Sequence, residues 1–396
     1  GVALTVTAAL VTRRAALAWG AAPLAATGAA VALLWTAAFA WGALSAMEVS
    51  LAALLVSAAL AAHARDRVIW VAGLAGLAPL ARPETAILIP LLALARPARG
   101  RRLAVFATIS GLALAPAVWF SLATIGSPVP ATVAAKVEGG LLGWFGGADE
   151  SVRRALMERP WEFARDWVGW LTTTHWLLPL LIPLGIVQAW RRHGPALGLP
   201  ALALVVHPLA MALLAPYRGP GFQEGRYSMH VLPLALVVLA AALPAGVRWQ
   251  RAGVATYLVI ALALLPGAAE RYGWAVQNIN AMQVHLGHWV DTHLPQRARL
   301  ALNDVGAIAY VSRREVIDLM GLVTPGIIPY RRRGEAGVID FVARTCPDYV
   351  IVFPAWFPEL TARRSLLEPI YAVQLPRNVV AGGREMVVYR LIRCAL

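Results

Sequence analysis

The sequence predicts a polytopic α-helical membrane protein that carries an α/β domain at its carboxyl end. Of its 396 residues, 59% are hydrophobic and only 14% are charged, and the mean hydropathy is +0.64. A soluble domain is about half apolar and about one quarter charged. A soluble globule of this length would lack the polar residues to cover its surface. The composition therefore excludes a soluble enzyme for most of the chain.

Eight apolar runs predict membrane spans, because a span needs about 20 mostly apolar residues. The runs cover residues 2–11 (cut short by the start of the sequence), 15–39, 44–62, 103–124, 171–190, 196–215, 229–245 and 252–266. Residues 68–95 form a further apolar stretch that Arg82-Pro83-Glu84 interrupts. We predict two short helices that meet at this break, in addition to about eight full spans.

The distribution of charge predicts the orientation of the spans. One set of loops holds 12 cations and a single acid, Asp66: Arg13, Arg14, Arg65, Arg67, Arg96, Arg99, Arg101, Arg102, Arg191, Arg192, Arg248 and Arg251. The alternate loops, residues 125–170 and 216–228, hold 7 cations and 7 acids. Short arginine-rich loops stay in the cytoplasm. The net charge of +14 is therefore a topology signal that needs no nucleic-acid partner.

The tail changes character after residue 267. Strand-length apolar runs (299–302, 316–319, 349–353, 371–375 and 386–392) alternate with candidate helices at 270–293, 334–346 and 358–367, which is typical of an α/β fold. We predict a transmembrane region over residues 1–267, with an external loop at 125–170, and an extracytoplasmic α/β domain over 268–396. The two cysteines, Cys346 and Cys394, argue against a thiolate metal centre. A disulfide and two free thiols remain alternatives for them.

Three charged residues fall inside the apolar stretches: Arg82, Glu48 and Glu84. An ionised side chain at the bilayer centre costs about 2.5–3.5 kcal/mol on insertion scales. Arg82 and Glu84 could form a mutual salt bridge that joins the two short helices. Alternatively, Pro83 ends the first helix, and Arg82 with the exposed backbone N–H groups of the next helix binds an anionic head group. For Glu48, a favourable place at a helix N-terminus is the alternative to a role in a site.

The two predicted outer loops add further polar residues. Lys136, the only lysine in the chain, lies in the first loop. Residues 217–228 bring Arg218, Glu224, Arg226 and Tyr227 to the same face. Trp161, Trp167 and Trp170 alternate with charges, and a membrane-interface belt explains them best. The chain has no Walker loop, HExxH or GxSxG motif, and His207 is interpreted as a packed residue.

Five short motifs follow one another in order along the chain. They are Ser45-Ala46-Met47-Glu48, Ala81-Arg82-Pro83-Glu84, Ser127 through Lys136, Gly225-Arg226-Tyr227 with Pro233, and Asn303-Asp304 with Ile317-Asp318. Together they resemble the motifs of the GT-C class of polyprenyl-phosphate-sugar-dependent membrane glycosyltransferases, near the cell-wall arabinofuranosyltransferase branch. Ala131 stands where the third motif often has Asn. The resemblance covers most of residues 1–325.

The resemblance implies transfer of a sugar, with inversion, from a polyprenyl-phosphate donor to an envelope glycan, lipid or protein acceptor on the outer face of the cell membrane. It implies that the donor phosphate binds Arg82, Lys136 and Arg226, and that Glu48, Glu84 and Tyr227 support these cations or contact the sugar. In this class an acidic residue of the first external loop is the general base. The sequence begins at Gly1 inside an apolar run, so we expect the catalytic base upstream of Gly1.

The remaining expectations concern the tail and the competing functions. Asp304 and Asp318 are candidates for the acceptor side, although turn chemistry after a strand is the better explanation of both. No metal is expected, and the lipid-linked sugar enters as a substrate. A transporter or flippase of lipid-linked sugars would also use buried charges and broken helices, and a non-catalytic envelope-assembly protein is the third alternative. The sequence does not disclose the sugar, the acceptor or the oligomeric state.

Overall fold

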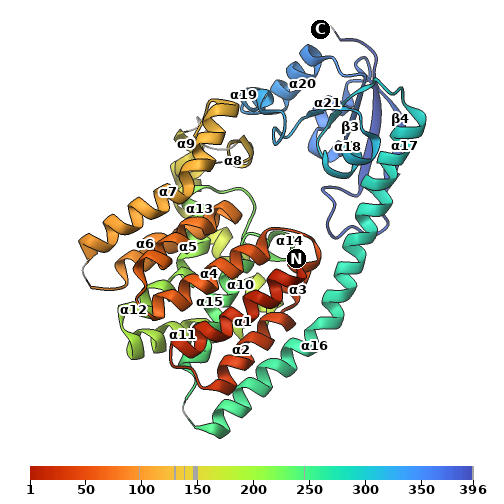
Figure 1. Ribbon diagram of the computed structural model, residues 1–396. Helices are drawn as coiled ribbons and strands as arrows, with labels where there is room; N and C mark the ends of the chain where they lie inside the picture. Colours follow the sequence, from red (N-terminus) through yellow and green to blue (C-terminus); the bar gives the residue numbers. More distant parts are fainter. Residues whose placement is uncertain (98, 129–130, 138, 146–149, 245, 395–396) are drawn as a thin grey trace. The chain divides into compact units, whose positions relative to one another are not determined.

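The computed structural model describes residues 1–97, 99–128, 131–137, 139–145, 150–244 and 246–394. The chain divides into two compact units (Figure 1). The first comprises Gly1–Phe120, Glu138–Phe145 and Asp149–Ala268, and the second comprises Ser121–Val137 and Ala269–Leu396. The second unit thus takes in part of the segment predicted as the external loop.

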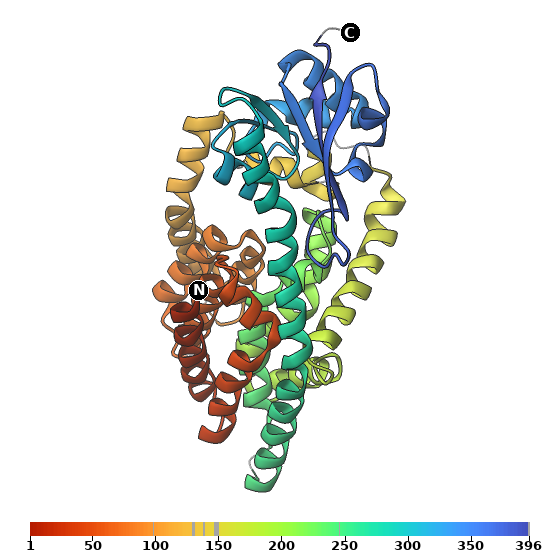
Figure 2. The same cartoon turned by 90° about the vertical axis from the view of Figure 1, so that its right-hand side faces the viewer.

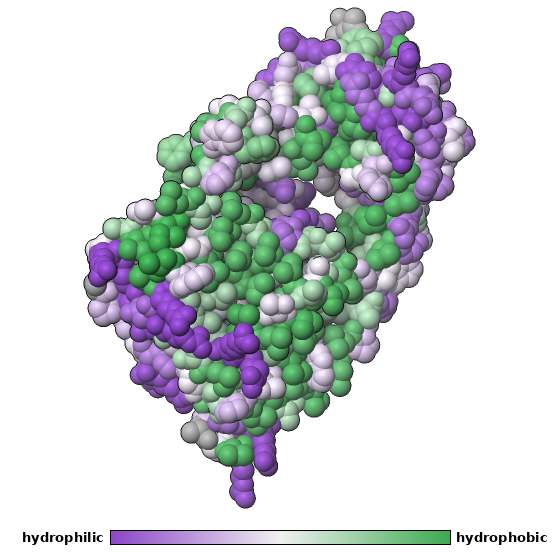
Figure 3. All heavy atoms as spheres, in the orientation of Figure 1, coloured by the Kyte–Doolittle hydropathy of each residue, from purple (hydrophilic) through white to green (hydrophobic). Residues whose placement is uncertain are grey.

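The first unit is built from helices (Figures 1 and 2). They are α1 (Val2–Ala18), α2 (Pro23–Trp35), α3 (Ala37–Leu44), α4 (Val49–Ala64), α5 (Val68–Ala81), α6 (Leu88–Leu94), most of α7 (Arg99–Ile125), α9 (Gly140–Phe145), α10 (Arg159–Thr174), α11 (Leu178–His193), α12 (Pro195–Ala201), α13 (Ala203–Leu214), α14 (Phe222–Gly225), α15 (Leu232–Ala242) and the first part of α16 (Val247–Ile279). Apolar side chains cover much of its surface (Figure 3), among them Leu112, Trp119 and Phe120. An apolar exterior of this extent suits a bilayer and not water.

Two hydroxyl pairs register α1 against α4. Thr5 Oγ1 lies 2.8 Å from Ser50 Oγ, and Thr12 Oγ1 lies 2.9 Å from Ser57 Oγ. The partners recur seven residues apart on both helices, so α1 and α4 run parallel. Small residues and hydroxyl hydrogen bonds are the usual contacts between membrane helices. Because α1 and α4 are parallel, the chain between them must run back to the end of the bundle at which α1 begins. Helices α2 and α3 together form this antiparallel segment, with a bend of 57° between them.

The predicted count of eight spans is not confirmed. Among the described residues, three helices are long and apolar enough to cross a membrane, or up to six if each bent pair of helices forms one span. The run at 15–39 is not one helix, because α1 continues through Arg13 and Arg14 to Ala18 and the chain turns at Gly20 with φ +80°. The run at 252–266 does not end at Pro266, which lies inside α16.

The apolar stretch at 68–95 is broken where the sequence predicts. Helix α5 ends at Ala81, a 3₁₀ turn covers Pro83–Ile87, and α6 follows. Arg82 takes an extended conformation, with φ −145° and ψ 110°, as a residue before proline prefers. Arg82 therefore lies between two helical segments, with a non-helical backbone conformation, near the middle of the apolar stretch.

The second unit is an α/β domain around one five-stranded sheet in the order β2-β1-β3-β5-β4. The strands are β1 (Arg299–Leu302), β2 (Glu315–Asp318), β3 (Tyr349–Val352), β4 (Leu367–Gln374) and β5 (Glu385–Leu391). β1 pairs in parallel with β2 and β3, whereas β5 is antiparallel to β3 and β4. The predicted α/β character is confirmed, and β4 is longer than the expected run at 371–375.

Helices cover both faces of this sheet. Leu300 and Leu302 pack toward α17 (His285–His293) and α18 (Gly306–Ser312), whereas Ala301 packs toward α20 (Gly334–Thr345). This division follows from the two-residue alternation of a strand. The remaining elements of the unit are α8 (Ala131–Lys136), α19 (Ile328–Arg331) and α21 (Pro358–Ala362).

A disulfide joins Cys346 and Cys394, whose Cα atoms are 5.2 Å apart. Cys346 follows α20 directly, and Cys394 lies three residues after β5. The bond resolves the alternatives that the sequence left open, and it ties the end of the chain back to the sheet.

We expect reduction of this disulfide to lower the free energy of unfolding of the second unit by about 2–4 kcal/mol, because the bond closes a long loop in the unfolded chain. Chemical unfolding with and without reductant measures the change. The Cys346→Ser/Cys394→Ser double variant is the control, since reductant should leave its midpoint unmoved. Equal midpoints for the oxidised and reduced wild type would contradict the assignment.

Candidate functional site

The first unit holds a buried arginine with an acidic partner. Arg82 is 3% exposed, and its Nε lies 3.2 Å from Oε1 of Glu48. Glu84 lies two residues after Arg82, in the first turn of the 3₁₀ segment that follows it. The break after α5 and the break before α4 therefore meet at a single ion pair. Glu48 makes no side-chain cap for α4, so pairing with Arg82, and not capping, explains its position.

A strained turn positions Arg226 and Tyr227. Gln223, Glu224 and Gly225 have φ values of +48°, +59° and +79°. A Cβ on Gly225 would lie 2.0 Å from Trp170 Nε1, and this indole N–H donates to the carbonyl of Glu224 at 2.9 Å. Only glycine fits a left-handed position with so close a neighbour. The turn thus locks the loop after α14 against α10.

Two guanidinium groups pack against the ring of Tyr227. The Cζ atom of Arg82 lies 5.2 Å from its centroid, and that of Arg226 lies 5.4 Å from it. Each contact falls in the range of cation–π attraction. Two like charges so close together repel each other, and an anion between them would remove this cost. Tyr227 therefore sets the spacing of a pair of cations.

Several buried donors of this cluster make no hydrogen bond to the described residues. They include Nη2 of Arg82 and Nε of Arg226. His230 is fully buried, and neither of its ring nitrogens has a hydrogen-bond partner among the residues that the structure describes. Buried polar groups are normally satisfied. These donors suit a bound anionic group.

A polar cavity of about 410 Å³ lies next to Tyr227. Tyr217 and Phe222 line it, and each ring centroid is 6.2 Å from that of Tyr227. Glu162 and Asp166, one turn apart on α10, also face the cavity. Asp166 Oδ2 accepts the N–H of Gly221 at 2.7 Å. The segments predicted as two separate outer loops therefore meet here.

The structure places two of the three tryptophans inside the protein. Trp167 and Trp170 are buried, whereas Trp161 is exposed. The interface-belt interpretation is wrong for the first two, because their α10 face packs against α13, where Trp167 lies 5.5 Å from His207. His207 is buried and its Nε2 lies 3.1 Å from Ser228 Oγ, which agrees with the prediction of a packed residue.

Lys136 belongs to the second unit and is described within it. It ends α8, whose Ala135 carbonyl accepts a hydrogen bond at 3.0 Å from Arg331 Nη1. The same guanidinium group donates to the Met320 carbonyl at 2.7 Å. Residues 129 and 130 of the predicted motif lie outside the described residues. The third motif thus packs beside the loop that follows β2.

The two tail aspartates differ in their surroundings. Asp318 is fully buried and accepts the N–H groups of Met320, Leu322 and Val323, which is the turn chemistry that the sequence favours. Asp304 accepts one hydrogen bond from Gln283 Nε2 at 2.9 Å. Burial raises the pKa of Asp304, the Gln283 hydrogen bond opposes this shift, and the charge of Asp318 adds to it.

Sequence reasoning did not identify the residues that line the polar cavity, and it missed His230. The cavity residues come from α10 and from the loop before α14, and only the fold brings these segments together. His230 follows Tyr227 by three residues, so a polar residue at the start of an apolar helix was the available signal. Among the described residues, no three His, Cys, Asp or Glu side chains are arranged to hold a metal ion.

Comparison with known proteins finds a family model and solved structures that are similar to this chain. Residues 276–389 match the family model of a domain of unknown function (DUF8728). The structure of ArnT from Cupriavidus metallidurans matches with 13% identity and a TM-score of 0.46, over 99% of this chain and 84% of that one. Two structures of the arabinofuranosyltransferase AftD from Mycobacteria match with 16% identity and TM-scores of 0.36 and 0.40. No curated protein matches the sequence.

The AftD matches extend over 98–99% of this chain but over only 34% of the AftD chain. This chain therefore spans about one third of the length of AftD. ArnT and AftD are GT-C glycosyltransferases, the class that the motifs of this chain resemble. The long apolar helices of this chain are those of a multi-pass membrane protein.

We expect Asp304 to make the second unit less stable as pH rises from about 4. Its pKa is raised in the folded state, so the folded form binds the proton more tightly than the unfolded form, and stability is lost as the proton leaves. Unfolding midpoints between pH 4 and 7 measure this slope. Asp304→Asn should flatten it, whereas Asp340→Asn, at an exposed ion pair with Arg333, should not. Identical slopes in all three proteins would refute the assignment.

Proposed function

We propose that this chain forms the donor-binding part of a GT-C-type glycosyltransferase. It transfers a sugar from a polyprenyl-phosphate carrier to an envelope glycan, lipid or protein at the outer face of the cell membrane. The observation that carries the proposal is a pair of cations, the buried Arg82 and the half-buried Arg226, on the ring of Tyr227. An apolar bundle has little use for two adjacent guanidinium groups unless an anion joins them.

The arrangement suits a leaving phosphate. As the sugar departs, its carrier phosphate gains negative charge, and cations already in position stabilise that charge without reorganisation. Arg82 Nη2 and Arg226 Nε supply buried donors that the described residues leave unused. Glu48 orients Arg82 through the 3.2 Å ion pair, and we assign Glu84, two residues after Arg82, to the same supporting role. We assign Lys136 to the phosphate as a further cation on the basis of its motif.

The polar cavity is the place that we assign to the sugar. Its volume of about 410 Å³ is within the range of small-molecule sites, which is about 300–1,000 Å³. The carboxylates of Glu162 and Asp166 accept hydrogen bonds from hydroxyl groups, and Tyr217 and Phe222 offer flat apolar walls. The Tyr227 ring contacts the Arg82 guanidinium and lies beside two rings of the cavity wall, so a sugar and its phosphate would lie next to the same ring.

This function fixes an orientation. The ends of α1, α11 and α16 that carry Arg14, Arg192 and Arg248 face the cytoplasm. The loop with Tyr227 and the domain after residue 268 then lie on the outer side of the membrane.

We expect Arg82→Ala to lower kcat/KM for transfer about 100-fold or more, because it removes a charge-stabilising donor. The assay uses the full-length protein in nanodiscs with a panel of radiolabelled polyprenyl-phosphate sugars. Arg102→Ala is the matched control. Arg102 is also a buried arginine of the first unit, and it pairs with Asp66 at 2.6 Å, away from Tyr227.

We expect the two variants to have similar thermal unfolding midpoints. A loss of transfer activity in Arg82→Ala alone then reports on the site and not on stability. Wild-type transfer by Arg82→Ala would overturn the proposal. A transporter gives a different result: the labelled lipid would change leaflet in sealed vesicles without any transfer of its sugar.

A further inference from the structure

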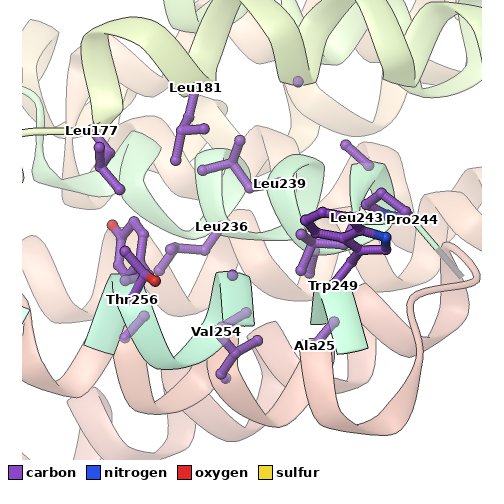
Figure 4. A pocket seen from close by; sticks show the side chains of 18 of the residues that line it. Ala25, Leu177, Leu181, Leu236, Leu239, Leu243, Pro244, Trp249, Val254 and Thr256 are labelled. Atoms are coloured by element: carbon purple, nitrogen blue, oxygen red, sulfur yellow. The ribbon is translucent and has the colours of Figure 1, made fainter. Parts of the chain in front are cut away.

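A second cavity, of about 580 Å³, lies between α2, α11, α15 and α16. Its walls are almost entirely apolar, and Figure 4 shows Leu181 and Leu239 pointing into it from α11 and α15. Trp249 lies at one end beside Leu243 and Pro244, and Leu177 and Thr256 lie at the other (Figure 4). At the latter end the His175 ring stacks on Tyr257, with centroids 3.7 Å apart.

Helix α16 contributes a wall without sealing the cavity. Only 6% of its apolar stretch is buried, against 83% of the stretch at Phe222–Ala242. Apolar cavities of this kind do not hold water. In a membrane, the space between α16 and its neighbours is therefore filled from the bilayer. A hydrocarbon chain has the right chemistry for these walls.

The end of the cavity at Trp249 is basic. Arg248 and Arg251 lie in the first turns of α16, on either side of Trp249. Arg192 donates to the Ala241 carbonyl at 2.7 Å and to the Leu243 carbonyl at 3.2 Å, so it lies against the cavity rim. Residues 167–223 and 225–269 contain no Asp or Glu. The exposed Trp249 adds the aromatic group that is typical of a membrane interface.

This basic end is separate from the donor site. Helix α15 begins at Leu232, five residues after Tyr227, and ends at Ala242, beside the rim residue Leu243. Its 11 residues rise about 16 Å at 1.5 Å per residue. A lipid whose phosphate is held at Arg82 would therefore not place that phosphate at Arg248.

We propose that this cavity binds one acyl chain of an anionic glycerophospholipid from the leaflet at the arginine-rich side. The chain packs against Leu181, Leu239 and Val254, and the phosphate lies at Arg248 and Arg251. Such a lipid completes the contact of α16 with α2, α11 and α15. This inference does not depend on sugar transfer.

Native mass spectrometry of the full chain tests the proposal, after reconstitution with phosphatidylglycerol or with phosphatidylcholine. We expect one retained phosphatidylglycerol per chain, and at least 5-fold lower retention of phosphatidylcholine. Thr256→Trp fills the cavity from an exposed wall position and should abolish retention. Val259→Trp, on the same helix, exposed and outside the lining, should retain the lipid. Arg248→Gln/Arg251→Gln should remove the preference for phosphatidylglycerol.

Equal retention by Thr256→Trp and Val259→Trp would overturn the site. Equal retention of both phospholipids by the wild type would overturn the choice of an anionic head group. If protein purified from its native membrane carries a polyprenyl lipid that Thr256→Trp loses, the cavity belongs to the donor and the proposal is wrong.

Discussion

The ion pair between Arg82 and Glu48 is the constraint on which the first unit depends. A charged guanidinium in an apolar bundle is costly unless it is paired, and here the pair joins two chain breaks, one after α5 and one before α4. Tyr227 then adds a third segment by packing its ring against both Arg82 and Arg226. The charged side chains of the first unit that would be costly to expose to lipid therefore lie together around Tyr227.

The local backbone conformation holds these polar side chains in position. Pro83 holds Arg82 in an extended conformation, Ala46 has φ +56° before Glu48, and the three residues before Arg226 all have positive φ. Conformations of this kind persist only where the surroundings enforce them, and they cluster at functional sites. The Trp170–Glu224 hydrogen bond is one such enforcement. The apolar helices around the cluster serve as a rigid frame for a small number of charges.

Sequence reasoning reached the parts that depend on local pattern. The break at Arg82-Pro83, the tail with its alternating strands and helices, and the turn role of Asp318 all follow from residues near one another in the chain. The ends of the helices could not be predicted in the same way, because the composition stays apolar on both sides of Gly20 and of Pro266. The backbone nevertheless turns at Gly20, whereas it stays helical at Pro266. The lining of the cavity beside Tyr227 could not be predicted, because Asp166 and Gly221 are 55 residues apart and only packing brings them together.

Cryo-electron microscopy of the full chain with a polyprenyl-phosphate bound is the most direct test of the donor site. Phosphate density is expected within hydrogen-bond distance of Arg82 Nη2 and of Arg226 Nε, with both guanidinium groups still in contact with the Tyr227 ring. The same map should keep the contact between Arg82 and Glu48. Phosphate density held elsewhere, with Arg82 and Arg226 facing no ligand, would contradict the account.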